Sequence, residues 1–228
     1  MWESLRQALR LVVGADPELR YIIATTMRMS FTSTLIASVL GIALGIVLGS
    51  RDFWGKKMLL RLTNTLMGLP PVVAGLVVFM LLSRRGPLGS FSLLFSVSAM
   101  VIAQVLLITP IITGLTASAI AAKAPLVLET TRGLGIGRGQ ELYYLCCETR
   151  AQLIAIMLTG YGRAISEVGA VQLVGGNVQF KTRVMTTAIV LETSRGRFSF
   201  ALALGVVLLV IAFAVNSLAQ YLQGENHA

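Results

Sequence analysis

The feature that most constrains this chain is a series of long apolar blocks that contain no charged side chain. These blocks run from Met29 to Ser50, Leu62 to Ser83, Gly86 to Ala122 and Phe198 to Gly224. A helix rises about 1.5 Å per residue, so roughly 20 consecutive apolar residues are needed to cross the hydrocarbon core of a membrane. Each block is long enough, and the sequence therefore predicts four membrane spans.

A fifth span is predicted from about residue 150 to 174, although it contains Arg163 and Glu167. Residues four apart share one face of a helix, and an ion pair there would offset part of the cost of removing both charges from water. We therefore expect an all-α polytopic membrane protein. Its five spans are expected at about 20–49, 57–83, 91–121, 150–174 and 198–222.

Composition and charge agree with a membrane protein that has no metal site. The chain is 55% hydrophobic and 13% charged, with a net charge of +9. The basic residues lie mostly in short connections, where they contact lipid headgroups, so membrane lipid is an expected partner and nucleic acid is not. Residues 2–13 read as an interfacial amphipathic helix. His227 and the adjacent Cys146 and Cys147 lack metal-ligand spacing, so no metal is expected.

Two spans contain prolines, which remove backbone hydrogen bonds within a helix. Pro70 and Pro71 fall in the second span and Pro110 in the third. We expect kinked or broken helices at these positions, which membrane proteins tolerate where protein or a water-filled cavity satisfies the freed carbonyls.

The first span instead carries small residues at intervals of four, which place them on one helical face and allow close helix packing. This face is expected to be buried in a bundle, and it comprises Ser33, Ala37, Gly41, Gly45 and Gly49.

Residues 124–149 form an insertion between the third and fourth spans that is too polar to cross a membrane. Glu129, Thr130, Thr131 and Gly135 match the spacing of the cytoplasmic coupling segment of ABC importer permeases, which this insertion resembles, with threonines where alanines are usual. The apolar-x-Leu-Pro element that follows in the family is not met in full here. The resemblance implies a helical hairpin that docks on an ATPase subunit. Its expected coupling residues are Glu129, Thr130, Thr131, Arg132, Gly133 and Gly135.

The resemblance extends over about residues 20 to 222 and is greatest to the tungstate permeases of ABC importers. The strings that carry it are LMGLPP (66–71), RRGP (84–87), GRAISEVGA (162–170), GGN (175–177) and TTAIVLET (186–193). Molybdate permeases share the general plan. Six residues within these strings are expected to line or gate a translocation pathway: Arg163, Glu167, Gly169, Asn177, Thr186 and Thr187.

The resemblance also implies the location of the protein, its partners and its source of energy. It predicts a single permease domain over residues 1–228 in a bacterial or archaeal cytoplasmic membrane, paired with a second copy of itself. The chain has no Gly-rich loop ending in Lys and Ser or Thr. ATP and Mg are therefore expected on a separate pair of ABC ATPase subunits, with no cofactor in this chain. An extracytoplasmic binding protein is expected to deliver the oxyanion.

Several readings stay open at this point. The substrate could be molybdate, sulfate or another small solute instead of tungstate, and Arg163 with Glu167 could be a structural bridge instead of a gate. A secondary transporter would leave the 124–149 insertion unexplained. A membrane-embedded enzyme lacks a converging nucleophile, base and oxyanion donor. With the insertion inside, lysines and arginines divide almost equally between the two sides, so the positive-inside rule gives no support. A basic outer face would attract an oxyanion.

Overall fold

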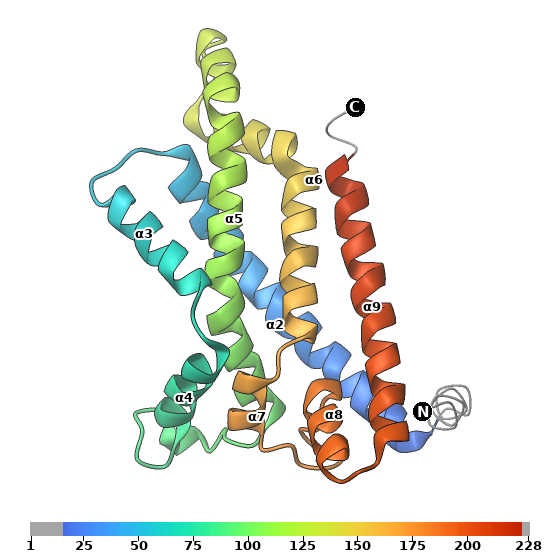
Figure 1. Ribbon diagram of the computed structural model, residues 1–228. Coiled ribbons are helices and arrows are strands. Elements are labelled where there is room, and N and C mark those ends of the chain that lie inside the picture. Colours follow the sequence, from blue (N-terminus) through green and yellow to red (C-terminus); the bar gives the residue numbers. More distant parts are fainter. Residues whose placement is uncertain (1–15, 225–228) are drawn as a thin grey trace.

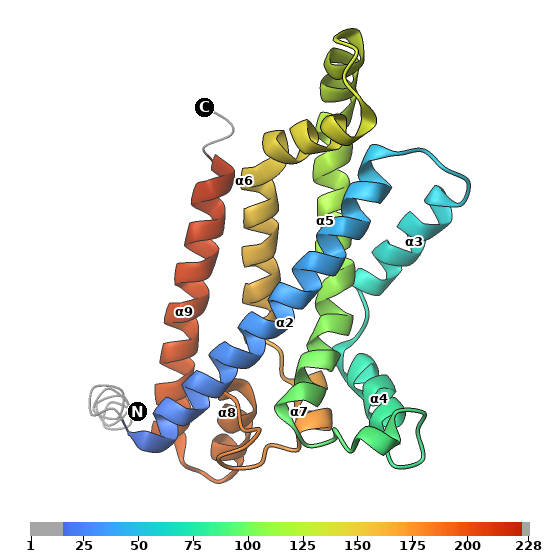
Figure 2. The same ribbon diagram turned by 180° about the vertical axis from the view of Figure 1, so that it is seen from behind.

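The computed structural model describes residues 16–224, and over this range it contains helices and no strand (Figures 1 and 2). The predicted amphipathic helix at residues 2–13 lies outside the described residues. The elements in chain order are α2 (Pro17–Ser50), α3 (Lys56–Met67), α4 (Pro71–Leu82), the 3-10 turn η1 (Gly89–Phe91), α5 (Val97–Gly133), α6 (Arg138–Ile165), α7 (Gly169–Gly175), α8 (Met185–Ser194) and α9 (Phe198–Gly224).

Three of these helices, α2, α5 and α9, are long and apolar enough to cross a membrane. The predicted span at 57–83 is two shorter helices, α3 and α4, that meet at an angle of 101° and form either one broken span, which would be the fourth, or a re-entrant loop. The break falls where Pro71 starts α4, preceded by Pro70 in an extended conformation. Proline suits the first helical position but cannot continue a helix begun upstream.

The predicted span at 150–174 is wrong as a single helix. The helix that contains its first part, α6, starts earlier, at Arg138, and ends at Ile165. After a break at residues 166–168 the chain forms the short helix α7. The apolar stretch of α6 after Arg150 is therefore shorter than the roughly 20 residues of a full crossing.

The third predicted span, 91–121, starts later and extends further in the structure. Helix α5 begins at Val97 and runs without interruption through Pro110 and Pro125 to Gly133. Hydroxyl groups accompany the first proline: Thr109 Oγ1 donates to the Val105 carbonyl at 2.7 Å and Thr113 Oγ1 donates to the Thr109 carbonyl at 2.8 Å. Helix α5 is therefore not broken at Pro110.

The small face of α2 is buried, as the sequence predicted, and it packs against α5. Gly41, Gly45 and Gly49 are so close to α5 that a Cβ at Gly45 would lie 2.5 Å from the Thr116 Cβ. Nearer the other end, Ser33 Oγ donates to Gln104 Oε1 at 2.6 Å. The Gln104 amide, fully buried, donates in turn to the carbonyl of Ala164 at 2.8 Å. These contacts join α2, α5 and α6 into one bundle.

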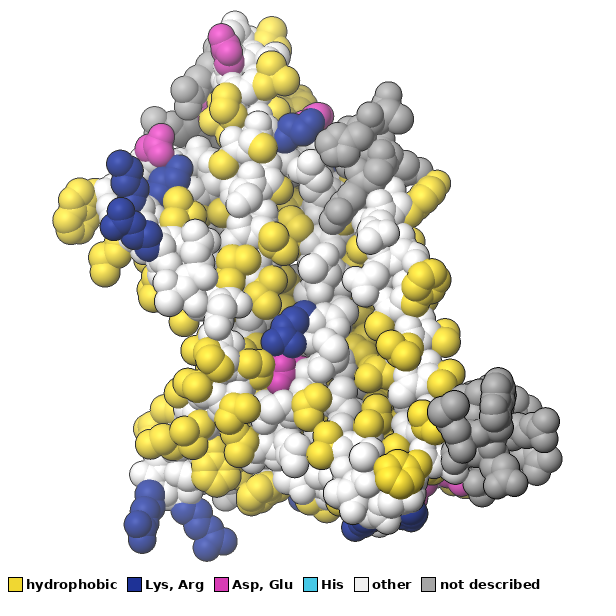
Figure 3. All heavy atoms as spheres, viewed as in Figure 1, with side chains coloured by type: hydrophobic (Ala, Val, Ile, Leu, Met, Phe, Trp, Pro, Cys, Tyr) yellow, Lys and Arg dark blue, Asp and Glu magenta, His cyan; other side chains and the backbone are white. Residues whose placement is uncertain are grey.

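The polar connections divide between the two ends of the bundle. The α2–α3 loop, the α5–α6 turn and the C-terminal end of α9 lie at one end (Figures 1 and 2). The start of α2, the segment between α4 and α5, and helices α7 and α8 lie at the other. Charged side chains gather at both ends, and between them a small charged group lies over the lower end of α6 (Figure 3). This is the two-sided arrangement that a membrane requires.

Candidate functional site: a projecting hairpin and a mid-bundle helix break

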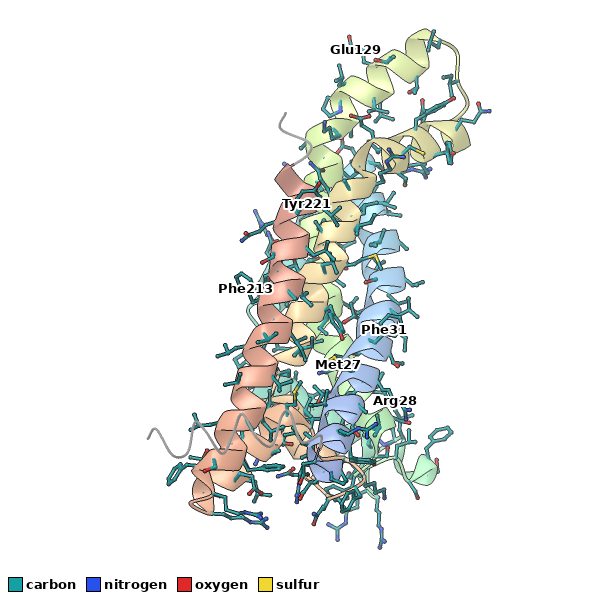
Figure 4. All side chains as sticks on the ribbon, turned by 90° about the vertical axis from the view of Figure 1, so that its right-hand side faces the viewer. Met27, Arg28, Phe31, Glu129, Phe213 and Tyr221 are labelled. Atoms are coloured by element: carbon teal, nitrogen blue, oxygen red, sulfur yellow. The ribbon has the colours of Figure 1, made fainter. Side chains whose placement is uncertain are left out.

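The last turns of α5 and the first turns of α6 form a helical hairpin that projects from the bundle, with Glu129 on its far part (Figure 4). Its base is apolar, because Leu145 of α6 is fully buried with Ile120 and Ala124 of α5. Lys123 Nζ also lies 3.4 Å from Glu148 Oε1 across the hairpin. The two helices are therefore held together where they leave the bundle.

The predicted coupling residues lie on the α5 side of the hairpin and in its turn. Glu129 and Thr130 are exposed, whereas Thr131 is buried and its hydroxyl donates to the Val127 carbonyl at 2.9 Å. Arg132 and Gly133 form the end of α5. Gly135 has φ +71°, and next to it the Ile136 N–H donates to the Thr131 carbonyl at 3.0 Å, which closes the helix end.

Four glycines around this turn have open space where a side chain would be. An added Cβ would meet no atom of the described residues within 4 Å at any of them, and only one has a left-handed backbone that favours glycine. Packing within the chain therefore does not explain the other three. The four are Gly133, Gly135, Gly137 and Gly139. Four positions without side chains would allow a docking partner to approach the backbone of the turn closely.

The second candidate site is the break after α6. Arg163 Nη1 lies 3.1 Å from Glu167 Oε2, so the predicted ion pair forms. The prediction that both residues share one helix is wrong, because α6 ends at Ile165 and Glu167 lies in the break. Glu167 is 4% exposed and its Oε1 accepts the Ala170 N–H at 3.3 Å, while Arg163 is 41% exposed. The carboxylate is fixed and the guanidinium is accessible.

Two more predicted residues meet this break. Gly169 is the first residue of α7, where a Cβ would lie 2.9 Å from Val72 Cγ2 of α4. Thr186 of α8 is buried, and its Oγ1 donates to the Glu167 carbonyl at 2.8 Å. The break is thus enclosed by α4 and α8 as well as by α6.

Asn177 and Thr187 form a separate group in the α7–α8 connection. Thr187 Oγ1 donates to Asn177 Oδ1 at 3.1 Å, and Asn177 Nδ2 donates to the Thr187 carbonyl at 3.3 Å. Asn177 has φ +51°, a conformation that asparagine tolerates better than most residues. These contacts fix the fold of the connection. Thr186 and Thr187 are adjacent in α8, so the two groups are linked through that helix.

Several arginines at the end of the bundle that holds α7 and α8 pair with carboxylates. Arg183, 7% exposed, lies 2.9 Å from Glu18 of α2, and Arg195 and Arg197 both contact the buried carboxylate of Glu192. Sequence reasoning missed Glu18 and Glu192 as partners, since Glu18 lies 165 positions from Arg183. The spacing of Glu192 to Arg195 was the one available signal. Arg84 and Arg85 have no carboxylate partner among the described residues.

Comparison with known proteins agrees with this architecture. Residues 41–225 match the family described as binding-protein-dependent transport system inner membrane component. The chain is 42% identical to the tungstate uptake system permease protein TupB of Peptoclostridium acidaminophilum, over 98% of each chain. It is 38% identical to a probable anion ABC transporter permease protein of Haloferax volcanii, over 89% of this chain and 91% of that one.

A solved structure also shares the fold. The crystal structure of an amino acid ABC transporter with histidines aligns with a TM-score of 0.68 and 14% identity, over 93% of this chain and 96% of that one. The chain therefore belongs to the family of inner membrane components of binding-protein-dependent transport systems, and it is a permease subunit of an ABC importer.

Proposed function

We propose that this chain carries tungstate inward across the cytoplasmic membrane of a bacterial or archaeal cell. The observation that carries the proposal is the 42% identity to a tungstate uptake permease over 98% of both chains. A second TupB, from Campylobacter jejuni, is 34% identical over 95% of this chain. Sulfate permeases are more distant, at 26% for CysW of Escherichia coli.

The proposed partners follow from this class of transporter. Two copies of the chain would sit on a pair of ATPase subunits that bind ATP and Mg, and an extracytoplasmic binding protein would deliver the anion. The proposed orientation places the α5–α6 hairpin, the α2–α3 loop and the end of α9 in the cytoplasm. Helices α7 and α8 and the segment between α4 and α5 then face outward, which agrees with the two ends of the bundle in Figure 1.

The geometry supports a mechanical link between hairpin and helix break. Helix α6 is continuous from Arg138 in the hairpin to Ile165, two residues before Glu167. Helix α5 is continuous from the hairpin to the outer end of the bundle at Val97. A displacement of the hairpin by the ATPase would therefore be carried along both helices to the Arg163–Glu167 pair, where the chain changes direction.

Arg163 is the residue we assign to the passing anion. Tungstate is a dianion at neutral pH, and a guanidinium can donate two hydrogen bonds to adjacent oxygens of an oxyanion. Arg163 is 41% exposed, so it can contact a ligand while Glu167 holds it from the buried side. The carboxylate also lowers the net positive charge, which favours release over tight retention.

The substrate assignment is tested by uptake into vesicles that contain this permease, its ATPase and its binding protein. We expect ATP-dependent accumulation of tungstate that molybdate inhibits weakly and sulfate does not inhibit. Because the binding protein can dominate selectivity, uptake should also be measured with each anion at a concentration that saturates the binding protein. Preferential uptake of sulfate or molybdate under both conditions would reject the tungstate assignment while keeping the permease class.

A further inference from the structure

A groove of about 290 Å³ lies between α2 and α6 on the side of the molecule seen in Figure 4. Apolar side chains make most of its wall, together with two hydroxyl groups. The lining residues are Phe31, Thr34 and Leu35 of α2 and Met157, Leu158 and Tyr161 of α6. Phe31 is 63% exposed, so one wall of the groove stands open to the surroundings of the protein.

Arg28 lies at the end of this groove nearer the start of α2. Positions 28, 31 and 35 share one face of a helix, so Arg28 follows Phe31 and Leu35 along the same stripe. Its neighbour Met27 contacts the groove as well, because the Tyr161 hydroxyl lies 3.3 Å from Met27 Sδ. Figure 4 labels Met27 and Arg28, which are adjacent in α2, and Phe31 about one turn further along that helix.

The guanidinium of Arg28 is exposed and pairs with no carboxylate among the described residues. It lies about 16 Å along the axis from Pro17, where α2 begins. From Met29 onward α2 contains no other charge. An unpaired cation at the edge of an apolar stretch requires an anion or water nearby.

Thr34 provides the next polar group along the groove. It is 6% exposed, and its hydroxyl has no hydrogen-bond partner within the described part of the chain. It lies about 9 Å further along the helix axis than Arg28. The groove thus offers a cation at its end, then a hydroxyl donor, and apolar walls formed by Leu35, Met157 and Leu158.

We propose that this groove binds one anionic phospholipid, with its phosphate on Arg28 and an acyl chain between α2 and α6. A phospholipid carries phosphate, ester carbonyls and hydrocarbon in that order, which matches the groove. A free inorganic phosphate would contact Arg28 but leave the apolar walls unfilled.

A second copy of the chain fits the groove less well than a lipid. The described carboxylates at this end of the bundle are engaged within the chain. Asp16 accepts the N–H groups of Glu18 and Leu19, Glu18 pairs with Arg183, and Glu192 pairs with two arginines. None of these is available to Arg28 from a second copy without breaking an existing contact.

The test is native mass spectrometry of the intact transporter titrated with phosphatidylglycerol, phosphatidylcholine or inorganic phosphate. We expect phosphatidylglycerol to bind more tightly than phosphatidylcholine, and Arg28→Gln to weaken phosphatidylglycerol about five-fold, as for one lost basic contact. Arg20→Gln is the matched control, because Arg20 is also exposed near the start of α2. It should leave binding unchanged. Leu158→Trp, which fills the groove, should reduce retention of both lipids.

Three results would overturn the proposal. The first is equal phosphatidylglycerol binding by wild type and Arg28→Gln. The second is competition by inorganic phosphate as effective as that by phosphatidylglycerol, which would make Arg28 a simple anion site. The third is efficient disulfide formation between two copies through Leu35→Cys in the assembled transporter, which would make this face an interface between copies.

Discussion

At the residue scale, the buried carboxylate of Glu167 makes the strongest demand on its surroundings. It accepts from the Ala170 N–H and pairs with Arg163, so two neighbours share the cost of its burial. Removing one partner of a buried ion pair is costly because the remaining charge stays out of water. The two residues should therefore respond very differently to neutralisation.

Arg163→Gln is expected to destabilise the protein by roughly 2 kcal/mol, below the range for a fully buried pair because Arg163 is 41% exposed. Glu167→Gln should cost less, since the amide keeps a hydrogen-bonding oxygen for Ala170. The double variant should recover most of the loss. Thermal unfolding of the purified transporter measures all three. Equal losses for Arg163→Gln and the double variant would show that the pair is not coupled.

Close approach of α2 and α5 at Gly45 gives a second prediction. Gly45→Ala would place a Cβ 2.5 Å from the Thr116 Cβ, so the helices must separate, at a cost of about 1–3 kcal/mol for overpacking. Gly205→Ala in α9 is the control, because none of the described residues lies within 4 Å of its added Cβ. It should be neutral or slightly stabilising. A Gly45→Ala protein as stable as the control would mean that the two helices are less closely packed.

At the element scale, the hairpin contains two cysteines whose labelling can show on which side of the membrane the hairpin lies. Cys147 is exposed and Cys146 is partly buried on α6. Burial, followed by the neighbouring Cys147 thiol, raises the pKa of Cys146 above its usual value. Because the thiolate is the reactive form, Cys146 needs a higher pH than an ordinary thiol to react.

A membrane-impermeant maleimide should therefore label Cys147 before Cys146 at neutral pH. Labelling of Cys146 in a Cys147→Ser variant should rise as the pH is increased above about 8.5, the usual thiol pKa. Both thiols should react in inside-out vesicles and stay unlabelled in right-side-out vesicles. Labelling from the outer side would reverse the proposed orientation.

The helices differ in how far sequence could predict them. The apolar blocks were sufficient for α2 and α9, and the small residues from Ser33 to Gly49 correctly indicated the buried face of α2. The end of α6 at Ile165 could not be predicted, because residues 166–168 contain neither glycine nor proline. The helix break at these residues instead accompanies contacts with α4 and α8, which are distant in sequence. At Pro110 the sequence allowed a kink or a break, and helix α5 continues through this residue without a break.

At the scale of the whole molecule, charged residues lie at both ends of the bundle, and many of them form ion pairs. The basic residues of the α7–α8–α9 region are largely neutralised by Glu18 and Glu192, which lie far from some of their partners in sequence. This pairing could not be predicted from the residues alone. At the end of the bundle that holds α7 and α8, the cations without a carboxylate partner in the described structure include Arg84, Arg85 and Lys181.

Electrostatic attraction of the anion should therefore depend on Arg84 and Arg85. The double variant Arg84→Gln/Arg85→Gln is expected to slow tungstate uptake at low ionic strength and to have little effect at 0.5 M salt, where screening acts within about 4 Å. Arg195→Gln/Arg197→Gln is the comparison: it should lower stability instead, because Glu192 is buried. A salt-independent defect in the first variant would indicate a docking role instead of attraction.

The most direct test of the account is ATP-dependent tungstate uptake by the complete transporter carrying Gly135→Arg in the hairpin. Gly55→Arg is the matched control, because both glycines have left-handed backbones, open surroundings and positions at the same end of the bundle. The account predicts that Gly135→Arg abolishes uptake while the permease still inserts, and that Gly55→Arg retains uptake. Normal uptake by Gly135→Arg, or uptake that does not require ATP, would contradict it.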